Sequence, residues 1–443
     1  IRTIVIKATM KNLQIVIGPI FILIFGNFCA AQNSNPRPII HDLSAALTDV
    51  MIVDGFSPPQ ASRAYYYSHV AYYEVIRQQK DEYITLAGQL NGLDSLPAAA
   101  DGVNLNYAAA VVFKKIAASI VYHREIMDEK ANILIADMST SLDKETVKQS
   151  TEYAELIVSR IAGWMSSDNY TKLKGLPRYQ LKKQPYAWEP TPPGYHDALE
   201  PNWYYLRTAT LDSASQFLPK HHISFDTAKT SEFYVASLEV YNTVNALTEE
   251  EHTIAKFWDC NPLQTRVEGH FMFAAKQMTP GGHWMAITGI ACVEKRLSEA
   301  ETSSVYANVA IGLFDGFITS WKAKFVYDLI RPETYINRYI DPNWRPVLET
   351  PPFPEYTSAH SVISMTAAQI LNDRIGPITY KDTVETRWGY PSRTFDSFIK
   401  AAEEVSDSRV YGGIHYRMGV DLGIWQGNML GEHIKRKIEF VSQ

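Results

Sequence analysis

Apolar residues recur at helical spacing along most of this chain, and this pattern limits the folds that it can adopt. Few segments alternate between apolar and polar residues as half-buried strands do. With 46% hydrophobic residues among 443, the chain can bury a large core, which excludes global disorder. The expected fold class is therefore all-α. The expected helices lie near residues 60–80, 104–124, 145–166, 228–246, 248–258, 267–292, 296–330, 359–373, 394–411 and 415–436.

The longest irregular stretch runs from about residue 175 to residue 227 and is rich in proline and aromatic residues. Loops of that length inside a compact domain are usually functional or wrap around a neighbouring surface. We therefore expect this segment to wrap between a first helical bundle and a second. Farther along, Thr248 is followed three residues later by Glu251, the spacing of a capping box at a helix start.

The amino-terminal residues have the layout of a secretory signal. Met10 and Lys11 precede the apolar run Leu13 to Phe25, which is too short to span a bilayer comfortably. Small residues ending at Ala31 form a cleavage site. We interpret residues 1–31 as upstream residues and a signal peptide, and residues 32–443 as a single helical domain. This interpretation predicts an exported protein, periplasmic or secreted, without membrane attachment after cleavage.

Charge and cysteine content exclude several classes of protein. The chain has 42 Lys and Arg against 48 Asp and Glu, a net charge of −6, and it lacks long basic blocks. Proteins that bind duplexes use such blocks on phosphates, so we expect no nucleic-acid partner. Only Cys260 and Cys292 would remain after cleavage, too few for a disulfide scaffold. The oligomeric state does not follow from the sequence.

Three short clusters in the last third of the chain concentrate cations and histidines. The first is Lys324 and Arg331, followed by Pro332. A spacing of seven residues returns to the same helix face after about two turns, so both cations are expected to point into one pocket. Pro332 disfavours helical geometry at Arg331, so the helix is expected to end there.

The second cluster is Ser358-Ala359-His360, which follows the proline-rich turn Pro351 to Pro354 and opens an apolar helical pattern. Ser358 is therefore expected at the helix N-cap. Backbone amides at a helix start bind oxyanions, so the Ser358 hydroxyl, the Ala359 amide and His360 could converge on one tetrahedral anion.

The third cluster is Ser408-Arg409 and His415, with Gly412-Gly413 between them. On one continuous helix Arg409 and His415 would face different sides, but the glycine pair can turn the chain so that both reach one site. Each cluster alone has an ordinary structural explanation. Together they provide one Lys, two Arg, two His and a Ser, the groups needed to hold a buried oxyanion.

This order of clusters resembles the three-part signature of the type 2 phosphatidic acid phosphatases and vanadium-dependent haloperoxidases. Trp321, together with Phe353 in its Pro-Pro-Phe-Pro context, resembles the haloperoxidase branch, and upstream segments such as Phe56 to Arg63 are similar to bacterial haloperoxidases, the iodoperoxidases above all. The resemblance implies two four-helix bundles with long wrapping loops, of the vanadium haloperoxidase and acid phosphatase type. It places the catalytic signature within residues 321–421.

The resemblance also implies a cofactor and roles for the matching residues. Vanadate would be bonded through vanadium to His415, and His360 would be the acid–base residue that takes a proton from hydrogen peroxide. Trp321 and Phe353 would wall the halide pocket. The enzyme would oxidise halide to a hypohalous species, with iodide favoured and bromide a second candidate. The remaining groups that would hold the vanadate oxygens are Lys324, Arg331, Ser358, Arg409 and the Ala359 amide.

This chain departs from the family pattern around His415. Gly419 stands where several relatives have an aspartate four residues after the histidine, and Asp421 lies at the wrong helical angle to replace it. Another hydrogen-bond acceptor is therefore needed to orient the His415 ring. Asp259 is a candidate carboxylate to balance the cations, with an exposed or core-capping role as the alternative.

Two other functions are compatible with the same residues. A secreted acid phosphatase of the same superfamily would use His415 as nucleophile and His360 to protonate the leaving group. Phosphate and vanadate have nearly the same shape, so an anion pocket alone does not separate them. A non-catalytic anion-binding protein would not need His360, and its presence argues against that function.

Overall fold

The computed structural model describes residues 37–442 except 221–222, 263 and 269–270. The expected signal peptide, residues 1–31, lies outside the described residues. The helices are α1 (Ile40–Asp54), α2 (Pro58–Ile76), α3 (Leu105–Ile120), α4 (Arg124–Ser139), α5 (Lys144–Ser166), α6 (Tyr170–Leu173), α7 (Glu232–Asn245), α8 (Glu249–Phe257), α9 (Pro280–Glu294), α10 (Glu299–Tyr327), α11 (Pro332–Tyr339), α12 (Ala359–Ile375), α13 (Phe398–Tyr411) and α14 (Arg417–Lys437). Short 3₁₀ helices span Arg77–Gln79, Trp203–Tyr205 and Val384–Trp388.

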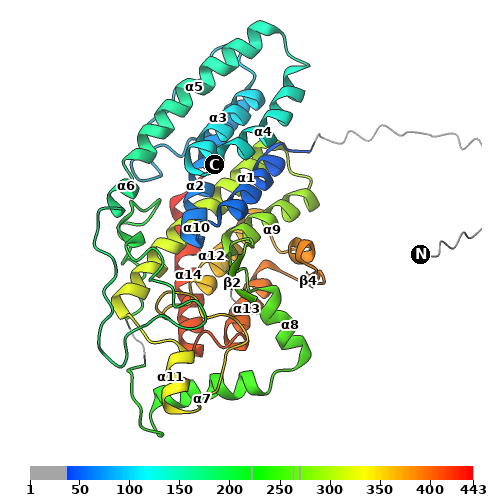
Figure 1. Ribbon diagram of the computed structural model, residues 1–443. Helices are drawn as coiled ribbons and strands as arrows, with labels where there is room; N and C mark the ends of the chain where they lie inside the picture. The colour runs from blue at the N-terminus through cyan, green and yellow to red at the C-terminus, as the bar shows by residue number, and fades with distance from the viewer. Residues whose placement is uncertain (1–36, 221–222, 263, 269–270, 443) are drawn as a thin grey trace, which may run out of the picture. The chain divides into compact units, whose positions relative to one another are not determined.

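The helices pack as two four-helix groups, which confirms the all-α expectation. In the first group α3 packs against α2, α4 and α5, and in the second group α12 packs against α10, α13 and α14. Helix α10 also packs against α2, so it joins the two groups (Figure 1). Among the described residues, no helix combines the length and hydropathy that crossing a membrane requires.

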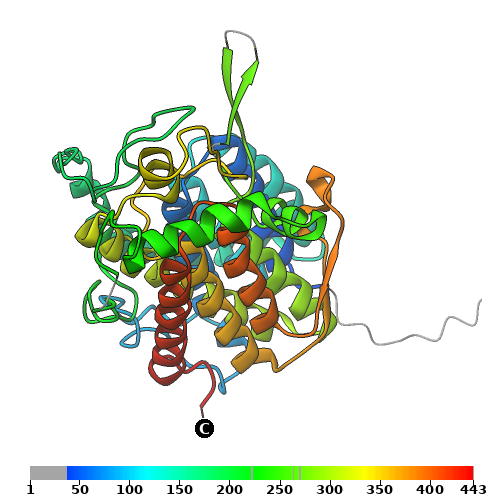
Figure 2. The ribbon, with the colours of Figure 1, turned by 90° about the horizontal axis from the view of Figure 1, so that it is seen from below.

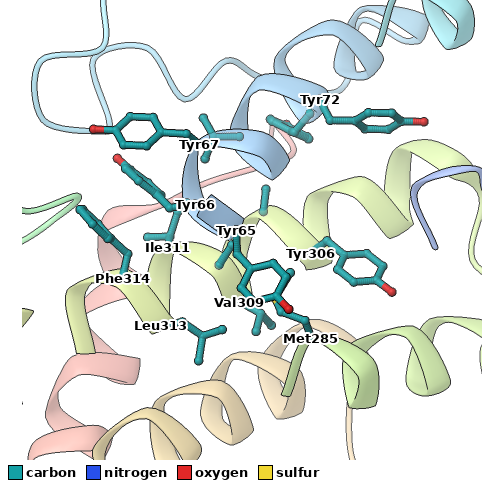
Figure 3. Close-up of a cluster of buried hydrophobic side chains, with 14 of the residues drawn as sticks. Tyr65, Tyr66, Tyr67, Tyr72, Met285, Tyr306, Val309, Ile311, Leu313 and Phe314 are labelled. Atoms are coloured by element: carbon teal, nitrogen blue, oxygen red, sulfur yellow. The ribbon is translucent and has the colours of Figure 1, made fainter. Parts of the chain in front are cut away.

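The contact between α2 and α10 is rich in buried aromatic side chains (Figure 3). Helix α2 begins with a capping box between Ser57 and Gln60 and then buries a run of tyrosines. Tyr66 stacks on Phe314 of α10 with ring centroids 4.5 Å apart and planes 7° from parallel. Burial of side chains this large contributes a few kcal/mol each, roughly 1.5 to 3, and this contact fixes α10 in place.

One expected helix is partly wrong. Residues 267–292 were expected to be helical throughout, but strands β1 (Gln264–Glu268) and β2 (Phe271–Ala275) form an antiparallel hairpin, visible at the top of Figure 2. Helix α9 begins only at Pro280, where the Thr279 side chain accepts a hydrogen bond from the Gly282 amide. β-branched and aromatic residues favour strands, and this preference outweighed the short helical pattern. A second small hairpin pairs β3 (Tyr380–Asp382) with β4 (Arg393–Phe395).

The end of α10 also differs from the expectation that the helix continues to Arg331. The helix ends at Tyr327, and Asp328 follows in the left-handed conformation with φ 52°. Arg331 is instead the N-cap of α11. The long irregular segment explains the difference, because Tyr179 donates a 2.6 Å hydrogen bond to Asp328 and Lys182 forms a 2.9 Å ion pair with it.

The described residues of that irregular segment, 175–220 and 223–227, contact both helical groups, since Arg207 donates to the Trp164 carbonyl of α5 at 3.0 Å and Leu199 is bonded to Trp321 of α10. Leu199 connects it to the proline-rich turn, since its amide donates to the Pro352 carbonyl at 2.9 Å. The Leu199 carbonyl accepts a 3.2 Å hydrogen bond from the indole of Trp321 on α10. Trp188 is buried, and its amide donates to the Asp328 carbonyl at 3.0 Å. The segment therefore forms part of the wall around the site described next.

Candidate functional site

Six of the nine residues to which the resemblance gives a role line one pocket of about 660 Å³. The other three lie outside its lining but are completely buried next to it. The structure therefore brings all three sequence clusters to one place, although α10 does not carry both Lys324 and Arg331. The lining residues are Trp321, Phe353, Ala359, His360, Arg409 and His415, and the buried neighbours are Lys324, Arg331 and Ser358.

Ser358 is the N-cap of α12, as expected from the sequence. Its hydroxyl oxygen accepts hydrogen bonds from the Ser361 amide at 3.3 Å and from the Ser361 hydroxyl at 2.9 Å. The amides of Ala359 and His360 belong to the first turn, where backbone donors have no acceptor within the helix. They also lie at the positive end of the helix dipole. This helix start is therefore suited to an anion.

Arg409 and His415 meet because the chain turns between them. Helix α13 ends at Tyr411, and Gly413 has a left-handed φ of 74°. A side chain on Gly413 would also crowd the backbone of Pro346, since its Cβ would lie 3.1 Å from the Cα of that residue. The glycine pair therefore acts as the sequence indicated.

Glu355 is the acceptor that orients His415. The Nδ1 atom of His415 lies 2.7 Å from the Oε1 atom of Glu355, which also accepts a 3.2 Å hydrogen bond from the Tyr416 amide. Arg331 donates from Nη1 toward Nε2 of His415 at 3.2 Å. An arginine can only donate, so Nε2 carries the lone pair and Nδ1 carries the proton. The ring is thus held with one basic nitrogen.

Electrostatics favour this neutral form of His415. Burial lowers the pKa of His415 well below its usual range, and the cations Arg331, Lys324 and Arg409 lower it further. Burial raises the pKa of Glu355 to about 7, although Arg331 and Lys324 oppose that shift. A neutral imidazole is the form that acts as a metal ligand.

Lys324 makes contacts that the sequence pattern does not reveal. Its ammonium donates to the carbonyls of Pro354 at 3.1 Å, Glu355 at 3.1 Å and Thr357 at 2.6 Å. These bonds use all three of its protons. Burial and Arg331 lower the pKa of Lys324 well below its usual range, whereas Glu355 opposes that shift and the three carbonyl acceptors require the charged ammonium. Lys324 therefore supports the segment that carries Glu355, and its charge lies behind the pocket wall.

Arg331 contributes a donor that the described part of the chain does not satisfy. Its Nε donates to the Phe353 carbonyl at 2.9 Å and its Nη1 to the Ile414 carbonyl at 2.8 Å. Its Nη2 is buried without a hydrogen-bond partner among the described residues. A buried donor left unsatisfied costs about 1 to 3 kcal/mol, so this atom indicates that an acceptor belongs beside it.

His360 and Arg409 face each other across the pocket lining. Arg409 donates from Nη1 toward the Nδ1 atom of His360 at 3.3 Å, and its Nη2 donates to the Trp258 carbonyl. Burial lowers the pKa of His360 well below its usual range, and the charge of Arg409 adds to this shift. His360 is therefore neutral at neutral pH, with its lone pair on Nδ1.

The aromatic wall is formed by Trp321 and Phe353, whose ring centroids lie 5.0 Å apart. The Lys324 ammonium lies 5.0 Å from the centre of the Phe353 ring, and the Arg331 guanidinium lies 5.1 Å from it. A cation near an aromatic ring is favourable when both are shielded from water. The pocket therefore combines an apolar wall with positive charge directly behind it.

The two aspartates considered in the sequence have different positions. Asp259 lines the pocket with 9% of its surface exposed, and burial raises its pKa to about 6 against the opposing charge of Arg409. Asp421 is exposed on α14, which agrees with its exclusion as a partner of His415. Sequence reasoning missed Glu355. The signal that could have revealed it was Gly419, which required a carboxylate from another segment.

Known proteins resemble the chain both locally and over its length. Residues 304–443 match the family described as the VCPO second helical-bundle domain. No match was found among curated proteins. A crystal structure described as that of the first bacterial vanadium-dependent iodoperoxidase is 37% identical, with a TM-score of 0.86 over 91% of this chain and 97% of that chain.

Two structures of bacterial vanadium-dependent chloroperoxidase share the fold at lower identity. The holo form is 14% identical with a TM-score of 0.64, covering 87% of this chain and 95% of that chain. The apo form is 15% identical with a TM-score of 0.63, covering 88% of this chain and 95% of that chain. At 37% identity over nearly the whole length of the iodoperoxidase, the chain belongs to the vanadium-dependent haloperoxidases, which are peroxidase oxidoreductases.

Proposed function

We propose that this protein uses vanadate and hydrogen peroxide to oxidise iodide to a hypohalous species. The observation that carries the proposal is His415, because its Nδ1 is bound by Glu355 while its basic Nε2 faces Arg331. A histidine whose second nitrogen is held by a carboxylate is the common arrangement for a metal ligand. The overall reaction consumes hydrogen peroxide, iodide and one proton, and it yields hypoiodous acid and water.

The residues in the pocket fit a tetrahedral oxyanion such as vanadate. Arg331 offers the buried Nη2 that has no partner among the described residues, and Arg409 lies in the pocket lining. The first amides of α12 and the Ser358 hydroxyl add uncharged donors. His415 would be the vanadium ligand, and Lys324 would contribute its positive charge from behind the pocket wall. Charge-assisted hydrogen bonds from arginine are well suited to such an anion.

Bound vanadate would supply a Lewis-acid centre that activates hydrogen peroxide toward halide. The protein contributes positive charge, orientation and proton transfer around that centre. His360 is neutral and basic at Nδ1, so it would take the peroxide proton at that atom once Arg409 donates to the anion instead. Glu355 holds the proton on the far nitrogen of His415 and keeps Nε2 available.

Iodide is the halide that we propose, with bromide as the second candidate. The wall of Trp321 and Phe353 suits a large, weakly hydrated and polarisable ion. The iodoperoxidase at 37% identity supports the same choice.

Export to the periplasm or beyond is also part of the proposal, and it rests on Met10 and the apolar run Leu13 to Phe25. Determining the amino-terminal residue of protein isolated from its native host tests whether residues 1–31 are removed during export.

The experiment compares purified protein before and after removal of vanadate. Iodide, bromide and chloride oxidation by hydrogen peroxide would be measured, with hydrolysis of a phosphate monoester assayed beside it. We expect iodide oxidation that requires added orthovanadate and is competed by phosphate, since both anions would use Arg331 and Arg409. Halide oxidation that survives exhaustive removal of vanadate would contradict the proposal. Phosphate ester hydrolysis as the main activity would instead support the acid phosphatase alternative with His415 as nucleophile.

A further inference from the structure

Beside the anion pocket, three side chains from separate parts of the chain converge on one buried point. Cys260 follows α8, His283 belongs to α9, and Glu385 follows β3. The Cys260 Sγ atom lies 3.4 Å from Nδ1 of His283 and 3.8 Å from Oε1 of Glu385. Nδ1 of His283 lies 3.1 Å from the same Oε1 atom. All three residues are buried, with 4%, 1% and 4% of their surfaces exposed.

We propose that Cys260, His283 and Glu385 bind a divalent cation of the zinc class. Tetrahedral zinc with bonds of about 2.3 Å to sulfur and about 2.0 to 2.2 Å to nitrogen or oxygen has ligand atoms roughly 3.3 to 3.6 Å apart. The three separations in this cluster bracket that range. The ligand types, a thiolate, an imidazole and a carboxylate, also match those that zinc takes.

Asp382 supports the cluster from behind. Its Oδ2 lies 2.7 Å from Nε2 of His283, and its other oxygen accepts a 2.9 Å hydrogen bond from the Val384 amide. A metal-binding histidine commonly donates its second N–H to a carboxylate, which fixes the ring and leaves the other nitrogen for the metal. Trp258 stacks on the His283 ring with centroids 4.6 Å apart and further restricts its orientation.

The cluster has a metal-free explanation that the experiment must exclude. In that form the thiol keeps its proton, and His283 is protonated and bridges Asp382 and Glu385. Burial alone would lower the pKa of His283, but Asp382 and Cys260 raise it well above the usual range. A divalent cation would replace the thiol proton and the Nδ1 proton, so binding would release both.

Cys260 and its neighbour Asp259 line the anion pocket, which gives the cation a route to the cluster. Cys260 also has a left-handed φ of 44°, a conformation uncommon for a residue with a side chain. The segment that carries Cys260 also contains Trp258, whose carbonyl accepts a hydrogen bond from Arg409. A bound cation would therefore fix the segment that positions Arg409.

The test of the proposal is to measure cobalt and zinc binding to the full chain after a chelator has removed any bound metal. We expect one Co²⁺ per chain, with thiolate-to-cobalt absorption in the near ultraviolet that is lost when zinc is added. Absence of this absorption in the wild-type protein would overturn the proposal, and that result does not depend on the folding of any variant. Saturation with vanadate, or His415→Ala, should still leave one cobalt bound per chain with the same thiolate absorption, because the proposed cation ligands are different side chains from those proposed to hold the anion.

Variants then assign the ligands. Cys260→Ser and Glu385→Gln should each abolish the cobalt spectrum, while Cys292→Ser is the control because Cys292 is the other buried cysteine among the described residues. Asp382→Asn should weaken binding by about 10 to 100-fold, the usual effect of losing such a supporting carboxylate. An unchanged spectrum in folded Cys260→Ser, checked by circular dichroism, would also overturn the proposal. Neither result depends on halide oxidation. The proposed cation site can therefore fail while the proposed function stands.

Discussion

The carboxylate of Glu355 occupies the space that a side chain on Gly419 would need. A Cβ atom on Gly419 would lie 2.3 Å from Oε1 and 2.8 Å from Oε2 of Glu355. Gly419 lies in the first turn of α14, four residues after His415, whereas Glu355 comes from the turn before α12. The chain therefore supplies the carboxylate partner of His415 from a different segment, and a glycine at position 419 is the steric consequence.

Exchanging the carboxylate between the two positions tests this relationship. Glu355→Ala should weaken vanadate binding by about 10 to 100-fold, because His415 loses the group that fixes its proton. Gly419→Asp alone should destabilise the fold by about 1 to 3 kcal/mol through overpacking against Glu355. The double variant should recover part of both losses, since the aspartate then enters the vacated space. Equilibrium dialysis with vanadate and urea unfolding measure the two effects, and strictly additive losses would refute the reciprocal relationship.

The turn at Gly413 should couple stability to anion binding. Gly413→Ala places a side chain in a left-handed conformation, which costs about 1 to 2 kcal/mol, and its Cβ also meets Pro346. The displaced turn should shift His415 relative to Arg409 and weaken vanadate binding. Gly88→Ala is the matched control, because Gly88 has φ 78° with nothing within 4 Å of an added Cβ. Gly88→Ala should lose only the stability that the left-handed conformation costs, without the contact with Pro346, and it should keep its vanadate affinity. Equal vanadate affinities in the two variants would count against this role for the turn.

Acid should destabilise the protein through His69, a buried residue of α2 that faces α1 and α3. Its ring bonds the Tyr65 carbonyl at 2.8 Å and the Ser44 hydroxyl at 3.1 Å, and burial lowers its pKa to about 3. Between that value and about 6.5 the unfolded chain binds more protons, so the free energy of unfolding falls as the pH falls. Between pH 7 and pH 5 this residue accounts for about 2 kcal/mol.

Urea unfolding at both pH values, with His69→Gln as the comparison, measures this contribution. The variant should lose about 2 kcal/mol less than the wild-type protein over the same interval, whatever its stability at pH 7. An identical pH dependence in the two proteins would show that His69 does not stay neutral in the folded state.

The sequence was sufficient to predict the fold class and the gathering of the three clusters, because helical periodicity and short motifs are local signals. Ser358 at a helix start and the turn between Arg409 and His415 are of this kind. The expectation that Lys324 and Arg331 lie on one face of the same helix was wrong, because it depended on where α10 ends. Contacts of Tyr179 and Lys182 with Asp328 accompany that end, and these pairs are about 150 residues apart in the chain.

Glu355 and the donor bonds of Lys324 were beyond sequence reasoning for the same reason. The Glu355 carboxylate meets His415 across 60 residues, and Lys324 meets the Thr357 carbonyl across 33. Residues this far apart in the chain are not brought into contact by the regular spacing of a single helix or strand. The hairpin of β1 and β2 was missed because a short apolar run suits a strand or a helix equally well.

The two histidines of the pocket have different proposed roles, and separating them tests the central claim most directly. His415→Ala removes the proposed vanadium ligand, whereas His360→Ala leaves the cations and the helix start in place. General acid–base catalysis contributes about 10² to 10⁴-fold to a rate, so His360→Ala should lose turnover of that order.

The decisive measurement is bound vanadium per chain together with iodide oxidation, made on the same preparations of the wild-type protein and both variants. We expect His360→Ala to bind vanadium like the wild-type protein while losing turnover, and His415→Ala to bind none. An empty site in His360→Ala with a loaded site in His415→Ala would reverse the two roles. Equal loading and equal activity in both variants would contradict the haloperoxidase site described here.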